Sequence, residues 1–104
     1  MLLFLKAPFV AQVRKGTKTA TIRPWKTCSL QRGDPLTFSG GIQATITQVT
    51  PRRLSTLTKA DICDDGFPSR AAFELAFRAI YPDLPDDAPV TVLRFRVTRR
   101  RRPE

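Results

Sequence analysis

The sequence predicts an α+β fold, in which a small mixed sheet curls into a barrel and carries two or three short helices. Three observations lead to this class. The chain of 104 residues suits one domain, which we place at residues 1–98 with a basic tail at 99–104. Its nine prolines divide it into short segments. Some segments alternate apolar and polar residues as strands do, whereas others repeat apolar residues at helical spacing.

The N-terminal segments predict a strand followed by a short helix. Residues 1–5 are apolar and are typical of a buried strand. Pro8 suits the first turn of a helix, and Phe9 and Val13 would form its apolar side. Gly16 would end this helix, because glycine adopts the left-handed conformation of a helix end without strain.

The middle of the chain predicts extended structure and a hairpin. Residues 17–23 alternate threonine with other residues, which favours a strand or an extended loop. A Gly-Asp-Pro turn at 33–35 leads into alternating apolar positions at 36 and 38. After the glycines at 40 and 41 the alternation resumes at 42, 44 and 46, so we expect a hairpin.

Two helices are expected in the second half. Thr58 and Asp61 have the spacing of a capping box, and this helix would end at Gly66. Ser69 would cap a longer helix. The apolar residues of that longer helix recur at helical spacing and are expected in the core: Phe73, Phe77 and Ile80.

The last predicted strand, residues 90–97, separates apolar from basic side chains. Leu93 and Phe95 would point to one face, and Arg94 and Arg96 to the other. This basic face belongs to a chain with a net charge of +9. Residues 1–60 hold ten Lys and Arg against one acid, whereas residues 61–90 hold seven acids against two Arg. Such asymmetry favours a nucleic-acid or nucleotide partner, although solvated surface charge would give the same pattern.

The composition excludes several kinds of catalysis. The chain has no histidine, which rules out a Ser-His-Asp triad and any zinc site that needs imidazole. Cys28 and Cys63 belong to no paired-cysteine motif, so we expect reduced thiols and a cytoplasmic protein. The apolar start is too short for a signal peptide, and no segment is long enough for a membrane span. We expect no metal and no cofactor.

Three stretches resemble the ASCH family, whose fold is similar to the PUA domain of RNA-modifying proteins. Residues 16–23 read Gly-Thr-Lys-Thr-Ala-Thr-Ile-Arg, similar to the family's Gly-x-Lys-Thr-x-Thr-Ile-Arg signature. Residues 32–38 resemble its Gly-Asp step into a strand. The third stretch is the Leu-Thr pair at 57–58 with Asp-Asp-Gly-Phe at 64–67, before a helix that ends at Tyr81. The match runs from about Phe9 to Val97, most of the chain.

The resemblance implies a ligand cleft on a small barrel, with RNA or a modified nucleoside as ligand. One branch of the family removes the acetyl group from the exocyclic nitrogen of acetylcytidine. Its lysine and threonine match Lys18 and Thr21, and its glutamate falls where this chain has Asp65. Aspartate is one methylene shorter, a loss of about 1.5 Å of reach. Lys18 would activate Thr21 as the nucleophile, Asp65 would act as acid and base, and Arg23 would clamp the substrate.

One geometric condition applies to this site. Lys18 and Thr21 are three residues apart, so on a straight strand they would face opposite ways. They converge only if Lys18 lies in the turn before the strand, or if a bulge separates them. The bland interpretations are a solvated lysine and a carboxylate at position 65 that merely stabilises a turn.

Other residues are candidates for substrate binding, and other functions stay open. Thr19 and Arg94 are further candidates, and Trp25 would either stack on a base or plug the barrel. The alternative functions are a non-catalytic RNA-binding module and a weak ribonuclease. The ribonuclease would need lysine chemistry or a metal at Asp64 and Asp65. The partner would be an acylated nucleoside or RNA, and the chain would be a monomer or a weak dimer.

Overall fold

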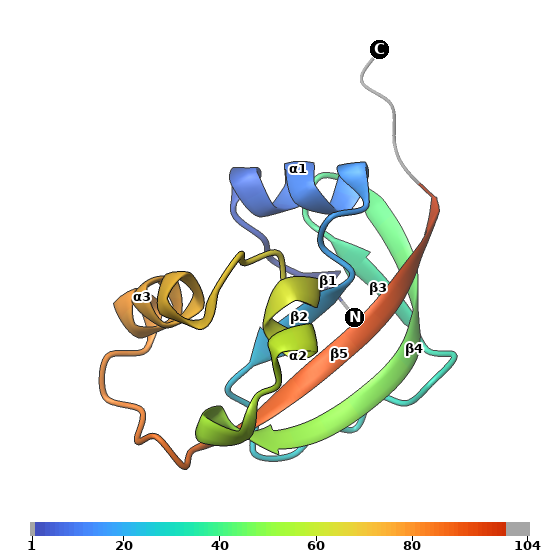
Figure 1. Ribbon diagram of the computed structural model, residues 1–104. Helices are drawn as coiled ribbons and strands as arrows, with labels where there is room; N and C mark the ends of the chain where they lie inside the picture. The colour runs from blue at the N-terminus through green and yellow to red at the C-terminus, as the bar shows by residue number, and fades with distance from the viewer. Residues whose placement is uncertain (1, 100–104) are drawn as a thin grey trace.

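The computed structural model describes residues 2–99, which form five strands and three α-helices (Figure 1). In chain order these are β1 (Leu2–Leu3), α1 (Ala7–Lys15), β2 (Ala20–Arg23), β3 (Pro35–Phe38), β4 (Ile42–Arg53), the 3₁₀ turn η1 (Leu54–Thr56), α2 (Lys59–Asp64), α3 (Arg70–Ile80) and β5 (Pro89–Arg99). The expected α+β class is confirmed. Residues 100–104, most of the predicted basic tail, lie outside the described residues, and Arg99 is the last residue of β5.

The strands form one mixed sheet in the order β1-β3-β4-β5-β2. β1 runs parallel to β3, and the other neighbours are antiparallel. The long β4 and β5 curve across the molecule, and the short β1 and β2 close its two ends (Figure 1). The two ends lie close together, as a hydrogen bond shows: Arg23 Nη2 of β2 donates to the Phe4 carbonyl just beyond β1, at 3.2 Å.

β4 is longer than the sequence predicts. The expected hairpin strand stopped at Ile46, but β4 continues to Arg53 and includes Pro51, which pairs with Thr91 of β5. A proline is expected only where no ladder hydrogen bond is needed. β3 pairs with β4 only as far as Thr45. Beyond that point β4 has a neighbour on one side only, so proline fits there without loss of a bond.

Two hydrophobic cores lie on opposite faces of β5. Leu93 and Phe95 belong to the core inside the curled sheet, against α1. Val90 and Val92 belong to a second core under α2 and α3. Arg94 and Arg96 share a face of β5 that is opposite to Leu93 and Phe95, as predicted. Toward Pro89 the same face is apolar and buried. The two cores place α1 and α3 on either side of β2.

The helix boundaries follow the predicted capping residues. Gly16 ends α1 with a φ of 81°. The Thr58 hydroxyl accepts from Asp61 N at 3.1 Å, and Ser69 caps α3 by accepting from Ala72 N at 3.1 Å. Ile80, expected in the core, is instead 49% exposed because it ends α3, where the helix passes beyond the core. No helix within residues 2–99 is long and apolar enough to cross a membrane.

Candidate functional site

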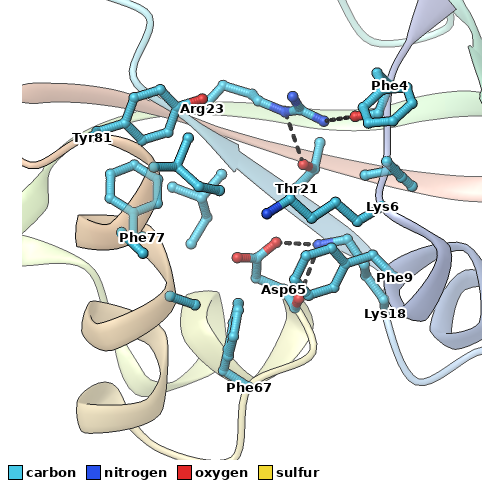
Figure 2. A pocket seen from close by; sticks show the side chains of 15 residues that line it. Phe4, Lys6, Phe9, Lys18, Thr21, Arg23, Asp65, Phe67, Phe77 and Tyr81 are labelled. Atoms are coloured by element: carbon cyan, nitrogen blue, oxygen red, sulfur yellow. Dashed lines mark hydrogen bonds and ion pairs between the residues drawn. The ribbon is translucent and has the colours of Figure 1, made fainter.

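A pocket of about 450 Å³ opens between α1, β2 and α3 (Figure 2). Its walls come from four segments of the chain: the residues between β1 and α1 with the start of α1, β2 with the turn before it, the turn between α2 and α3, and the last turns of α3. Three residues predicted to be catalytic, Lys18, Thr21 and Asp65, line it together with Arg23. The structure therefore gathers in one place the residues that the resemblance implied.

Lys18 reaches the pocket from the turn before β2. Gly16 reverses the chain, and the Gln12 carbonyl accepts from Thr17 N at 3.0 Å and from Lys18 N at 3.2 Å. β2 begins only at Ala20, so Lys18 does not follow the alternation of the strand. The geometric condition for convergence with Thr21 is therefore met by the turn, without a bulge in β2.

Lys18 and Asp65 form a buried ion pair. Lys18 Nζ contacts the Asp65 carboxylate and also donates to the Asp65 backbone carbonyl at 2.9 Å. The residues are only 3% and 5% exposed. The same ammonium lies 5.4 Å from the centre of the Phe9 ring, a distance at which cation–π attraction acts. Asp65 is held because it ends α2, where its N–H donates to the Asp61 carbonyl at 3.1 Å.

Burial opposes the charged form of both members of the pair. Desolvation lowers the pKa of Lys18, the nearby Asp65 charge opposes this shift, and Arg23 adds to it. Desolvation raises the pKa of Asp65, against the opposing effects of Lys18, the Ile22 backbone and Arg23. The pair can exist as two ions or as a neutral amine beside a protonated carboxyl. The free-energy difference between these two states is therefore smaller in the pocket than in water.

Thr21 and Arg23 extend the site along β2. Thr21 is 3% exposed, and its Oγ1 accepts from Arg23 Nε at 3.1 Å. The residues are two apart on one strand, so both side chains lie on the same face. Because Oγ1 accepts this bond, the threonine hydroxyl proton remains available to a base in the pocket.

A series of aromatic rings forms one wall. Successive ring centres of Phe9, Phe67, Phe73, Phe77 and Tyr81 lie 5.9, 5.6, 5.0 and 4.9 Å apart. All of them except Phe73 line the pocket. Such a surface favours a flat, aromatic ligand, because base–aromatic stacking contributes about 1–3 kcal/mol per base. Helical spacing placed Phe77 in the core and gave no indication of this second role.

Three predicted substrate-binding residues lie away from the pocket. Thr19 is exposed, and its backbone pairs with Asp64 and Phe95. Trp25 is half-buried and packs against the core inside the curled sheet, the arrangement of a plug. Arg94 forms ion pairs with acidic residues of α2. None of the three lines the pocket, so the site proposed below does not include them.

Asp61 is the centre of the charge cluster that holds Arg94. It is fully buried, and it accepts from Arg94 Nη2 at 2.7 Å and from Arg52 Nε at 3.2 Å. Hydrogen bonds and these cations outweigh the effect of its burial and hold the pKa of Asp61 below its usual value. The cluster fastens α2 to β4 and β5, and so positions the helix that ends at Asp65.

The same contacts bear on the metal hypothesis. Asp64 forms an ion pair with Arg94 at 3.2 Å, and Asp65 forms one with Lys18, so the two carboxylates are directed to different cations. Within residues 2–99, no group of three or more His, Cys, Asp or Glu side chains could hold a metal ion. The structure offers no support for a carboxylate-bound metal at this pair.

Two further residues near the site were not singled out from the sequence. Gln12 of α1 donates from Nε2 to the Gly66 carbonyl at 3.3 Å, and its own carbonyl holds the Lys18 turn. It therefore touches both segments that carry the ion pair. Lys6, which precedes α1, lines the pocket and points into it (Figure 2). No sequence pattern marks either residue, because each acts through contacts with distant segments.

Comparisons with known proteins place the fold. Neither a protein-family model nor a curated protein matches the sequence. An ASCH domain from Lactobacillus crispatus JV V101 superposes with a TM-score of 0.78 at 16% identity, over 92% of this chain and 77% of that one. A hypothetical protein matches with a TM-score of 0.77 at 16% identity, over 92% and 96%. ASCH from Zymomonas mobilis matches with a TM-score of 0.68 at 14% identity, over 91% and 65%.

These similarities show that the chain has the fold of ASCH domains. The expected barrel-like α+β architecture is thereby confirmed. At 14–16% identity the likeness concerns the fold alone, and the chemistry must be argued from the pocket itself.

Proposed function

We propose that this protein is an ASCH-type amidohydrolase that removes the acyl group from the exocyclic nitrogen of acetylcytidine. One observation carries the proposal. Lys18 and Thr21 from one segment and Asp65 from another are buried and line one pocket with an aromatic wall. Amide hydrolysis needs a nucleophile, a base to activate it and an acid for the leaving amine, and these residue types supply all three.

Thr21 is the nucleophile in this proposal, and Lys18 is its base. The neutral amine of Lys18 takes the hydroxyl proton while Oγ1 bonds to the carbonyl carbon of the acyl group. Burial lowers the pKa of Lys18, which is the direction that a lysine base requires. Lysine-activated hydroxyls are an established alternative to the histidine triad, which this chain cannot form.

Asp65 supplies the proton for the leaving group. Its pKa is raised by burial, which favours the protonated carboxyl that an acid needs. The bond from the acyl carbon to the exocyclic nitrogen then breaks, cytidine leaves with this proton, and the acyl group stays on Thr21. Water then attacks the ester and gives a proton to Asp65, while Lys18 returns its proton to Oγ1, so both residues regain their starting states. The sum is acetylcytidine plus water to cytidine plus acetic acid, which ionises to acetate in solution. Arg23 donates to Oγ1 in the free protein and can turn to the developing oxyanion.

Aspartate in place of the family's glutamate is compatible with this role. The shorter side chain still contacts Lys18, which also bonds the Asp65 backbone carbonyl at 2.9 Å. The close approach of the two segments therefore offsets the missing methylene. The wall formed by Phe9, Phe67 and Phe77 provides an apolar surface for the cytosine ring and the acyl methyl.

A second candidate is a non-catalytic RNA-binding module that uses the same pocket. The net charge of +9 favours it, although Arg94 of the predicted basic face is neutralised by Asp61 and Asp64. This alternative predicts RNA affinity that falls steeply with salt, with a slope of roughly −0.7 per phosphate neutralised on single strands. Affinity that does not change with salt would argue against it.

The experiment that tests the proposal is incubation of the purified protein with acetylcytidine. We expect cytidine and acetate to form in equal amounts, and chromatography measures both products over time. Cytidine that accumulates no faster than in a protein-free control, with a folded protein at high concentration, would contradict the proposal and favour the binding module.

A further inference from the structure

Lys6 is a cation at the pocket that the proposed chemistry does not use. It lines the pocket and is exposed, whereas Lys18 and Asp65 lie buried. Figure 2 shows its side chain extended into the pocket. Within residues 2–99, no hydrogen bond or ion pair holds its ammonium. An unpaired cation that points into a ligand pocket is available to an anionic group of the ligand.

The charges of the pocket support this view. Its lining includes three cations, Lys6, Lys18 and Arg23, and a single anion, Asp65. The buried Lys18 is paired with Asp65, so the excess positive charge comes from Arg23 and from Lys6. A neutral nucleoside would leave this excess without a partner, whereas a ligand with one phosphate would offset it.

The orientation imposed by the proposed reaction places the phosphate at Lys6. The acylated nitrogen must lie at the buried pair of Lys18 and Thr21. The ribose is attached to the opposite side of the cytosine ring, so it extends toward the exposed side of the pocket, where Lys6 lies. A phosphate on the ribose would therefore meet the ammonium.

The surroundings favour one phosphate over a chain of phosphates. The other exposed residues of the lining are apolar, with Phe4 72% and Ile80 49% exposed. The segment after Tyr81 is acidic, with exposed aspartates at 83 and 87, while Asp86 is paired with Arg78 at 2.7 Å. An RNA backbone that continued past the pocket on this side would meet apolar and negative groups.

We infer that Lys6 forms a phosphate subsite at the open side of the pocket, and that the ligand is an acylated cytidine mononucleotide. The inference rests on the proposed function for the position of the base. It adds a specificity that the three catalytic residues do not supply, because they act at the acyl group only.

Binding of the reaction's product form tests the inference without hydrolysis. Calorimetric titration compares cytidine with cytidine 5′-monophosphate on the full-length protein. We expect about five- to tenfold tighter binding of the nucleotide, because a charged hydrogen bond is stronger than a neutral one. In Lys6→Ala this preference should disappear, and in Lys6→Arg it should persist. Lys15→Ala, which removes an exposed lysine of α1 that does not line the pocket, should keep it.

The outcomes separate this inference from the proposed function. Equal affinity of the wild-type protein for cytidine and its monophosphate would overturn the phosphate subsite and leave the reaction standing. A preference for the nucleotide that depends on Lys6, without hydrolysis of acetylcytidine or of its 5′-monophosphate, would support the subsite and overturn the reaction. A short cytidine oligonucleotide that binds more tightly than the mononucleotide would overturn the choice of ligand. Absence of binding by all three would overturn the phosphate subsite, whereas the reaction is decided by the hydrolysis assay.

Discussion

The Lys18 ammonium and the Asp65 carboxylate form an ion pair that is almost completely removed from water, although 47 positions separate them in the chain. Two turns create it: the one that follows α1 and the one that ends α2. A buried pair of this kind adds little net stability, because desolvation offsets the attraction between the charges. Its importance for function is that both the ion pair and the neutral amine with a protonated carboxyl are accessible beside Thr21.

Replacement of Lys18 by methionine should make stability depend on pH. The variant leaves buried Asp65 without its ion-pair partner, which raises its pKa further above the unfolded value of 3.8. The folded state then binds more protons than the unfolded state above that value, so stability falls as pH rises through the folded pKa. We expect a loss of about 3 kcal/mol at pH 8 and a smaller loss at pH 5, measured by denaturant unfolding. Equal losses at both pH values would contradict an ionised Asp65 beside Lys18.

Replacement of Asp65 by asparagine should slow hydrolysis by about 10²–10⁴-fold, because the leaving amine loses its acid. The Asp65 charge raises the pKa of Lys18, so its removal should also shift the Lys18 limb of the pH–rate profile to lower pH. kcat/KM measured across the pH range checks both effects. Asp65→Glu, which keeps a carboxyl, serves as the control and should be more active than the asparagine variant. Wild-type kinetics in Asp65→Asn would remove Asp65 from the mechanism.

Asp61 should govern stability in acid. Its pKa is lowered in the folded protein from 3.8, so its contribution is fully present above that value and is lost as pH falls through the folded pKa. In Asp61→Asn, Arg52 and Arg94 lose their shared partner, and we expect about 3 kcal/mol of destabilisation at pH 7. The difference between variant and wild type should shrink below about pH 4. Thermal unfolding across pH tests this, and a difference that is constant down to pH 2 would be inconsistent with the cluster.

Gly66 and Gln12 should be coupled in stability. Gly66 has a φ of 95°, and a Cβ there would lie 2.5 Å from Gln12 Oε1. Gly66→Ala is therefore expected to cost about 1–2 kcal/mol from the backbone, and more from the contact. In a Gln12→Ala background the contact is relieved, so the same substitution should cost less. A double-mutant cycle by denaturant unfolding measures this coupling, and identical costs in both backgrounds would show that the side chains do not interact.

Local chemistry made most of the fold predictable. Gly16, Thr58 and Ser69 mark helix ends through groups within a few residues of each other, so the sequence contains the whole interaction. The path of β4 was harder to predict. Whether Pro51 can lie in a strand depends on how far β3 extends beside it, and that is a property of the sheet and not of the segment.

The site was predictable only in part. Lys18, Thr21 and Asp65 came from a resemblance, and the convergence of Lys18 and Thr21 required either a turn before the strand or a bulge between them. Arg94 was expected to bind substrate, whereas in the structure it pairs with Asp61, which lies 33 positions away on another element. The aromatic wall and Lys6 depend on where α3 and α1 pack against β2, which spacing along the chain does not reveal.

The most direct test of the account is the rate of cytidine release from acetylcytidine by the wild-type protein, Lys18→Ala and Lys15→Ala. Both substitutions remove one positive charge, but only Lys18 lines the pocket. We predict that Lys18→Ala, shown to be folded by circular dichroism, loses activity by at least about 10³-fold, whereas Lys15→Ala releases cytidine at the wild-type rate. Undiminished release by a folded Lys18→Ala variant would contradict the central claim that the buried lysine activates Thr21.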